Sequence, residues 1–178
     1  MAISERFEKC SFLPAQLNPN LLLNRGSSSR KEYVMKLKKG ESYFKKHGPD
    51  ALPDLSIKNE ILKHTKDKNI PCAVAFEIAE ALQVSPKEVG KTADLMNFKL
   101  TKCQLGLFGY QPQKKIVKSR DSIEENLKDT VSRSLSQGRL SCKDAWEIAS
   151  RFNIGKMAVS GACETMGIKI KNCQLGAF

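Results

Sequence analysis

Residues 72–108 read CAVAFEIAEALQVSPKEVGKTADLMNFKLTKCQLGLF, and residues 142–178 read CKDAWEIASRFNIGKMAVSGACETMGIKIKNCQLGAF. The two stretches align without a gap at an offset of 70 residues, and 13 of the 37 aligned positions are identical. Many other pairs are similar in size and polarity, such as Phe76 with Trp146. The chain therefore contains a tandem duplication, and the fold of one copy predicts the fold of the other.

The duplication divides the 178 residues into four parts. Weaker matching extends each copy backward, so we expect repeat 1 at residues 51–110 and repeat 2 at residues 121–178. Residues 1–50 are expected to form a basic N-terminal extension that is partly disordered or arm-like, and residues 111–120 a basic linker. A domain of about 60 residues buries only about 60% of its unfolded surface. We therefore expect the two repeats to pack together.

Each repeat contains the same order of predicted elements. A helix opens near residues 54–56, and a capping box at 122–125 opens its counterpart in repeat 2. A short extended piece, a helix with apolar residues at helical spacing, a tight turn and a third helix follow. Residues 85–88, Ser-Pro-Lys-Glu, combine an N-cap, a proline at the first helical position and a capping-box glutamate. Alternating apolar and polar residues at 98–103 and 168–173 then predict a strand with one solvated face.

The pattern AxEIAxxLxVSxxxVxxxADLM at residues 75–96 resembles the helix-turn-helix of winged-helix DNA-binding domains. The small Ala79 lies near the helix crossing, residues 84–85 form the turn, and Val89 packs the third helix against the second. The resemblance implies a fold that is mainly α with short β-strands, built from two tandem winged-helix-like trihelical repeats. The function that it implies is DNA binding by a transcriptional regulator, with double-stranded DNA as the partner.

The excess of positive charge lies mainly outside the repeats. The chain carries 30 Lys and Arg against 19 Asp and Glu, a net charge of +11. The extension has ten basic and five acidic residues and the linker has four basic residues, whereas each repeat has eight basic and seven acidic residues. Non-specific affinity for DNA comes mainly from neutralised phosphates. We therefore expect the extension and the linker to supply most of the affinity, and the repeats to supply the geometry.

The candidate DNA-contacting residues lie on the third helices, the strands and the linker. Lys87 and Lys91 are one turn apart and can reach phosphates or guanine edges, although a solvated helix face is the alternative interpretation. The matching helix of repeat 2 offers only Lys156 and the small Ser160, so it either approaches a DNA groove closely or packs against protein. If the repeats act as an internal dimer, the third helices contact half-sites about 34 Å apart. The remaining candidates are Lys99, Lys102, Lys114, Lys115, Lys118, Arg120, Lys169 and Lys171.

Two cysteines recur in each repeat at a spacing of 31 residues. The first of each pair falls at a predicted helix start, where backbone N–H groups favour a thiolate. Cys163 aligns with Ala93 and is expected in the core, and Cys10 lies in a segment without a readable pattern. A metal or redox site in an accessory or scaffold protein that binds another protein is the alternative function. Its candidate residues are Cys72, Cys103, Cys142 and Cys173.

The Cys-Gln-Leu-Gly-x-Phe ends of the repeats, residues 103–108 and 173–178, are interpreted as structural end-pieces whose leucines close the core. In a winged-helix arrangement the strand that ends at Cys72 runs antiparallel to the strand that ends at Cys103. About five residues, at roughly 3.3 Å each, then separate these two thiols, beyond the reach of a disulfide. We therefore expect no disulfide within a repeat. If the thiols act together, we expect their pairing to cross between the repeats, with Cys103 near Cys173.

Other functional patterns are missing from the sequence. It has no Walker loop, no GxGxxG after a strand, no HExxH motif and no closely spaced cysteine pair of a zinc ribbon. His47 and His64 stand in Lys-rich stretches that are typical of solvated side chains. We therefore expect a non-enzymatic protein without a cofactor. The sequence also lacks an apolar stretch long enough to cross a bilayer and a secretory signal, which predicts a cytoplasmic protein without a membrane partner. Homodimerisation through the N-terminal arm is left open.

Overall fold

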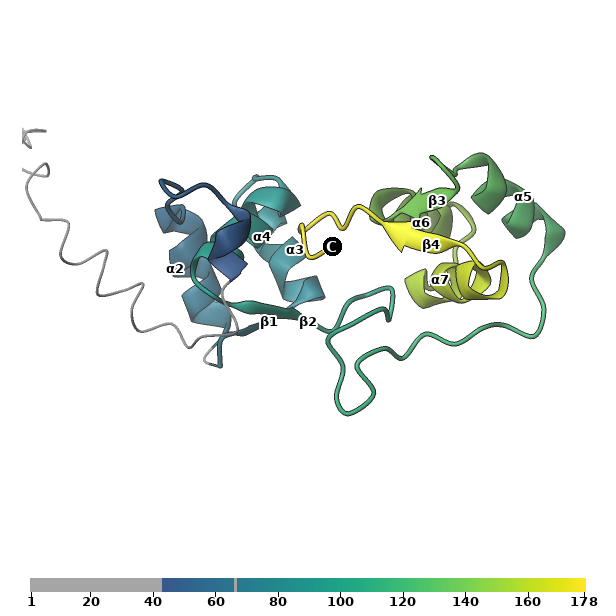
Figure 1. The fold of residues 1–178 in the computed structure, drawn as a ribbon, viewed down its shortest axis with the longest axis horizontal. Helices are drawn as coiled ribbons and strands as arrows, with labels where there is room; N and C mark the ends of the chain where they lie inside the picture. The colour runs from purple at the N-terminus through teal and green to yellow at the C-terminus, as the bar shows by residue number, and fades with distance from the viewer. Residues whose placement is uncertain (1–42, 66) are drawn as a thin grey trace, which may run out of the picture. The chain divides into compact units, whose positions relative to one another are not determined.

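The computed structural model describes residues 43–65 and 67–178, and these are mainly helical with a few short strands (Figure 1). Most of the N-terminal extension, including Cys10, lies outside the described residues. Among the described residues, no helix is both long and apolar enough to cross a membrane. A short 3-10 helix, η2 (Tyr43–Lys46), precedes the first repeat.

Both repeats have the predicted order of helix, short strand, helix, turn, helix and strand. Repeat 1 contains α2 (Leu55–His64), β1 (Asn69–Pro71), α3 (Cys72–Ala81), α4 (Pro86–Leu95) and β2 (Lys99–Thr101). Repeat 2 contains α5 (Glu125–Arg133), β3 (Arg139–Ser141), α6 (Cys142–Arg151), α7 (Lys156–Thr165) and β4 (Lys169–Lys171).

Two of the three predicted helix starts are confirmed. The Asp54 carboxylate accepts a hydrogen bond from the backbone N–H of Ile57 at 2.9 Å and caps α2. Ser85 and Glu88 form the expected reciprocal capping box at the start of α4. Such caps satisfy backbone donors that the first helical turn leaves unpaired.

The capping box predicted at 122–125 is wrong. Helix α5 begins only at Glu125, and its N-cap residue, Glu124, makes no side-chain capping hydrogen bond. The preceding chain is held by other contacts, because the Arg120 backbone N–H donates to Thr165 Oγ1 at 2.7 Å and Ile123 packs against the core of repeat 2. These contacts keep the chain out of the helix until residue 125.

The two strands of each repeat pair in parallel, so the expected antiparallel arrangement is wrong. Pro71 lies opposite Thr101 in the pair β1–β2, and Ser141 lies opposite Lys171 in the pair β3–β4. A pair of helices connects the strands of each sheet, and a connection of that length allows the chain to enter the second strand in the same direction. The residues that follow paired strands therefore leave from the same end of each sheet.

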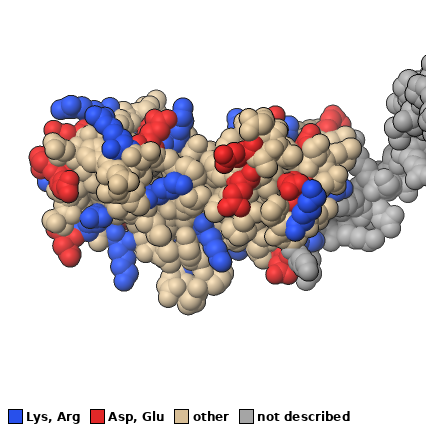
Figure 2. Space-filling model, turned by 180° about the vertical axis from the view of Figure 1, so that it is seen from behind, with Lys and Arg blue, Asp and Glu red and all other residues tan. Residues whose placement is uncertain are grey.

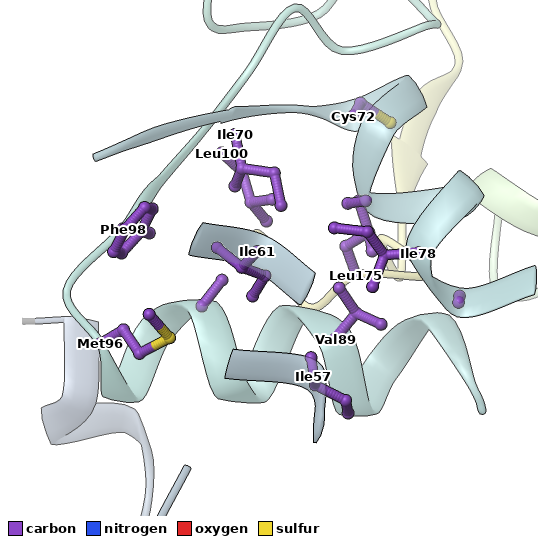
Figure 3. Close-up of a cluster of buried hydrophobic side chains, with 13 residues drawn as sticks. Ile57, Ile61, Ile70, Cys72, Ile78, Val89, Met96, Phe98, Leu100 and Leu175 are labelled. Atoms are coloured by element: carbon purple, nitrogen blue, oxygen red, sulfur yellow. The ribbon is translucent and has the colours of Figure 1, made fainter. Parts of the chain in front are cut away.

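Each repeat contributes a leucine to the core of the other. The core of repeat 1 contains Leu175 of repeat 2, which is 2% exposed and lies near Ile78 and Val89 (Figure 3). The core of repeat 2 contains Leu105 of repeat 1, which is 0% exposed. The expectation that these leucines close a core is confirmed, but each end-piece closes the core of the opposite repeat.

Small residues on the third helices allow the end-pieces to approach closely. A Cβ atom on Gly90 of α4 would overlap the backbone carbonyl of Leu175. The aligned residue of repeat 2 is Ser160 on α7, which is 0% exposed and donates its hydroxyl to the Leu105 carbonyl at 2.6 Å. The exchanged leucines are therefore held by the backbone as well as by apolar packing.

An aromatic pair also joins the repeats. The rings of Phe76 on α3 and Trp146 on α6 lie with their centroids 4.3 Å apart. Contacts of this kind join both repeats into one compact unit among the described residues, and the expectation that the repeats pack together is confirmed.

We predict that Leu175→Ala loosens repeat 1 more than repeat 2, because the missing side chain leaves a cavity between α3 and α4. Burial of this kind predicts a decrease of about 2–5 kcal/mol in the free energy of unfolding. Hydrogen exchange should show faster exchange in α3 and α4 than in α6 and α7. Leu140→Ala, in the core of repeat 2, is the control and should show the opposite order. If Leu175→Ala instead increases hydrogen exchange equally in both repeats, or more in α6 and α7, then Leu175 does not close the core of repeat 1.

Candidate nucleic-acid interface

The structure brings two of the predicted lysines together with residues from η2 and the segment after it. Lys87 and Lys91 are exposed on α4 and line a hollow of about 640 Å³. Lys46 and His47 line the same hollow from the segment that precedes repeat 1. Its two acidic residues, Glu88 and Asp94, both have partners within the protein. This α4 hollow therefore has three lysines against two acidic residues, and Asp94 pairs with Lys46 and His47.

A buried carboxylate fixes the basic segment against α4. Asp94 has a side chain that is 6% exposed, and its Oδ2 atom lies 3.3 Å from Lys46 Nζ and 3.2 Å from His47 Nε2. The Tyr43 backbone N–H donates to Asn97 Oδ1 at 3.4 Å just beyond the helix. The expectation of a solvated His47 is therefore wrong, because this ring packs beside a buried acid. His64 is 44% exposed and lies beside Glu60 at 3.3 Å.

The capping carboxylate occupies the start of α4. Hydrogen bonds from the Ser85 side chain and backbone lower the pKa of Glu88. Glu88 therefore remains ionised and turns toward Ser85, while Lys87 and Lys91 extend from the helix into the hollow.

The corresponding helix of repeat 2 is covered by the protein itself. Lys156 Nζ lies 3.3 Å from the Trp146 ring centroid and donates to the side chain of Gln104, and burial lowers the pKa of this lysine. Ser160 is fully buried, and a Cβ on Gly161 would lie 3.0 Å from the Lys118 carbonyl oxygen. Of the two interpretations of this helix, packing against protein is the one observed. Ser160 has no surface with which to contact DNA.

Some groups of the linker bind α7, and others are exposed to solvent. Lys115 Nζ lies 2.6 Å from Glu164 Oε2, and the backbone of Arg120 is bound to Thr165. The side chains of Lys114, Lys118 and Arg120 are exposed. The linker therefore lies along α7 and presents three cations to solvent.

The strand lysines lie on other surfaces. Lys99 is exposed at β2 and lines a smaller hollow of about 290 Å³ with Lys46, and Lys102 is exposed just after the strand. Lys169 and Lys171 line a third hollow beside β4. The predicted residues thus do not form a single interface, and Figure 2 shows basic and acidic side chains interspersed over one face. Only the α4 hollow, among those of the described residues, joins both third-helix lysines to additional cations.

The position of Lys46 and His47 beside α4 was not predicted from the sequence. The signal was the basic run FKKH at 44–47, but this run lies outside the aligned repeats. Its partner, Asp94, lies on the same face of α4 as Lys87 and Lys91, seven and three residues after them. An acid on that face is expected to be exposed, so the local sequence gave no signal that the segment at 46–47 pairs with it.

The repeat cysteines surround the contact between the repeats. Cys72, Cys103 and Cys142 are buried and Cys173 is half-buried, and each of these four is a free thiol. The pKa of Cys103 is raised mainly by burial and also by the charge of Cys173, which supports the expected proximity of these two residues. The expected separation of Cys72 from Cys103 rested on antiparallel strands and is wrong for that reason, because both residues follow the same end of the parallel sheet.

The environment of these thiols opposes ionisation. Burial raises the pKa of Cys72 to about 12 and that of Cys163 to about 11, and it also raises the pKa of Cys142. Cys72 does begin α3 as expected, but desolvation outweighs the N–H groups at the helix start. Among the described residues, no group of three or more His, Cys, Asp or Glu side chains is placed to hold a metal ion.

No family model, no curated protein and no solved structure matches the chain.

We predict that the buried Cys72 thiol makes the fold sensitive to alkali. The folded state holds the Cys72 proton up to a pKa of about 12, whereas a thiol in the unfolded chain releases its proton near pH 8.5. This stabilisation is fully present below about pH 8.5 and disappears as the pH rises toward about 12. Urea unfolding at about pH 7.5 and about pH 10.5, on either side of the unfolded pKa, should show a smaller decrease in stability in Cys72→Ala than in the natural chain. An equal decrease in both would mean that this thiol is solvated.

Proposed function

We propose that the protein binds double-stranded DNA through the α4 hollow of repeat 1. The observation that carries the proposal is the convergence of Lys46, His47, Lys87 and Lys91 on the exposed side of one third helix. A helix of this kind fits the major groove, where lysines contact phosphates or guanine edges. The net charge of +11 favours approach to the DNA polyanion.

The proposal relies on the helix arrangement and not on a wing. Helices α2, α3 and α4 pack around a shared core, and α4 follows α3 after the short turn at 82–85, as in a helix-turn-helix. The parallel pair β1–β2 differs from the hairpin of a winged helix. We therefore assign base and phosphate contacts to α4 and to the segment at 46–47, and we assign none to the strands.

Repeat 2 has a supporting role in this proposal. The linker and the end-piece of repeat 1 pack against helix α7 at Gly161 and Ser160, so we assign no second half-site to this helix. Leu175 and Gly176 of repeat 2 line the α4 hollow. Repeat 2 thus completes the binding surface of repeat 1, and the DNA site should span one half-site. Regulation of transcription is the role that we propose for this binding.

The test is a mobility-shift titration of the full chain against a duplex of about 20 base pairs, two helical turns, at two salt concentrations. Lys87→Ala/Lys91→Ala should weaken binding and reduce the slope of log K against log salt by up to about 2, at about 0.9 for each phosphate that is no longer neutralised. Lys63→Ala/Lys143→Ala removes the same charge from side chains that are 68% and 71% exposed on other helices, and it should preserve the slope.

Two results would contradict the proposal. Unchanged affinity in Lys87→Ala/Lys91→Ala would remove α4 from the interface. An equal decrease in affinity in both double variants would show that the duplex responds only to net charge.

A further inference from the structure

The two equivalent strands β2 and β4 differ in how well they are covered. Phe98 and Leu100 at β2 are 6% and 9% exposed. The aligned residues of repeat 2 are Ile168 and Ile170, and both are only half-buried. Because the duplication supplies the same local fold twice, the difference must come from what packs on each strand.

In repeat 1, η2 packs against α4 and borders the hollow beside β2. Tyr43 and Lys46 line the hollow of about 290 Å³ beside Phe98 and Leu100. Lys46 is held by its ion pair with Asp94 at 3.3 Å. In repeat 1, a short segment with an aromatic side chain, Tyr43, therefore lies beside strand β2.

In repeat 2 the linker supplies only half of this arrangement. Lys115 pairs with Glu164, the residue aligned with Asp94, so the ion pair is reproduced. The linker residues around it, QPQKKI at 111–116, carry no aromatic side chain to correspond to Tyr43. The hollow beside β4 is accordingly larger, at about 710 Å³. Its apolar lining comprises Leu107, Phe108, Ile168, Ile170 and Phe178.

We propose that the hollow beside β4 binds an extended acidic peptide of a protein partner, with a large aromatic or aliphatic side chain seated on the apolar lining. Lys169 and Lys171 line the hollow and complement Asp or Glu residues on either side of that side chain, while Lys115 and Glu164, which also line it, pair with each other. Peptides of this kind commonly add a strand to a sheet edge.

The geometry of β4 fits such a peptide. Strand β4 pairs with β3 in a sheet of two strands, so its other edge faces away from β3. Residues 168–172 line the hollow without a break. Five extended residues span roughly 16 Å, at about 3.3 Å each, which is the length of a short docked strand. Apolar side chains on the lining favour a peptide over the phosphate backbone of a duplex, because only the peptide removes apolar surface from water.

The experiment measures fluorescence polarisation of three labelled heptapeptides with the full chain. EDVFVDE carries acidic ends and an apolar centre, KKVFVKK has the same centre with basic ends, and EDSGSDE has the acidic ends alone. EDVFVDE should bind at least about tenfold more tightly than either other peptide, which corresponds to about 1.4 kcal/mol. Backbone chemical-shift changes should include residues 168–172.

A pair of matched variants locates the site. Lys169→Glu/Lys171→Glu should weaken EDVFVDE binding at least about tenfold, because attraction becomes repulsion at both ends of the peptide. Lys99→Glu/Lys102→Glu changes the same charge at the covered strand of repeat 1 and should bind the peptide as the natural chain does. Circular dichroism of each variant confirms that it is folded.

Four outcomes would overturn the proposal. Equal binding of all three peptides, or an equal decrease in both double variants, would leave no specific site beside β4. Displacement of EDVFVDE by the DNA duplex in the Lys87→Ala/Lys91→Ala background would make nucleic acid the occupant. If the chain dimerises with rising concentration and Lys169→Glu/Lys171→Glu abolishes the dimer, the occupant of the hollow is a second copy of the chain. Displacement by the duplex would also contradict the assignment of no DNA contact to the strands, whereas the other three results leave the DNA proposal intact, because that proposal is tested at α4.

Discussion

The reciprocal burial of Leu105 and Leu175 is the constraint on which the rest of the structure depends. Each leucine fills the core of the opposite repeat, so neither small core is complete without the other half of the chain. Gly90 and Ser160 make this possible because their small side chains let the end-piece backbones reach the third helices. A repeat of this size buries little apolar surface of its own, and the leucine from the opposite repeat increases the apolar surface that each core buries.

The exchange also explains how two copies of one unit acquired different surfaces. The linker and the end-piece of repeat 1 cover α7, whereas the start of α4 stays exposed beside Lys46 and His47. Conversely, η2 borders the hollow beside β2, where Phe98 and Leu100 are buried, while β4 retains half-buried isoleucines. One copy therefore presents a basic helix and the other an apolar strand edge. We propose that the first surface binds DNA and the second an acidic peptide.

Much of the local structure followed from sequence patterns. The internal repeat, the order of elements and the caps at Asp54 and Ser85 depend on nearby residues, and they were predicted correctly. The direction of strand pairing was predicted wrongly. Alternation of apolar and polar residues indicates which face of a strand is solvated, but it does not indicate whether the neighbouring strand is parallel or antiparallel. The exchange was missed for a similar reason: Leu105 has the same apolar pattern whether it closes its own core or a neighbouring one. The Cys72 thiolate and the solvated His47 were errors about burial, which the local sequence did not reveal.

Methyl NOE spectroscopy tests the exchange of end-pieces most directly. In a protein labelled at Leu, Val and Ile methyl groups, we expect NOEs from Leu175 to Val89 and Ile78 of repeat 1. A mixture of differently labelled chains should show that these contacts form within one molecule. NOEs from Leu175 to Val159 and Ile148, the aligned residues of its own repeat, would contradict the account.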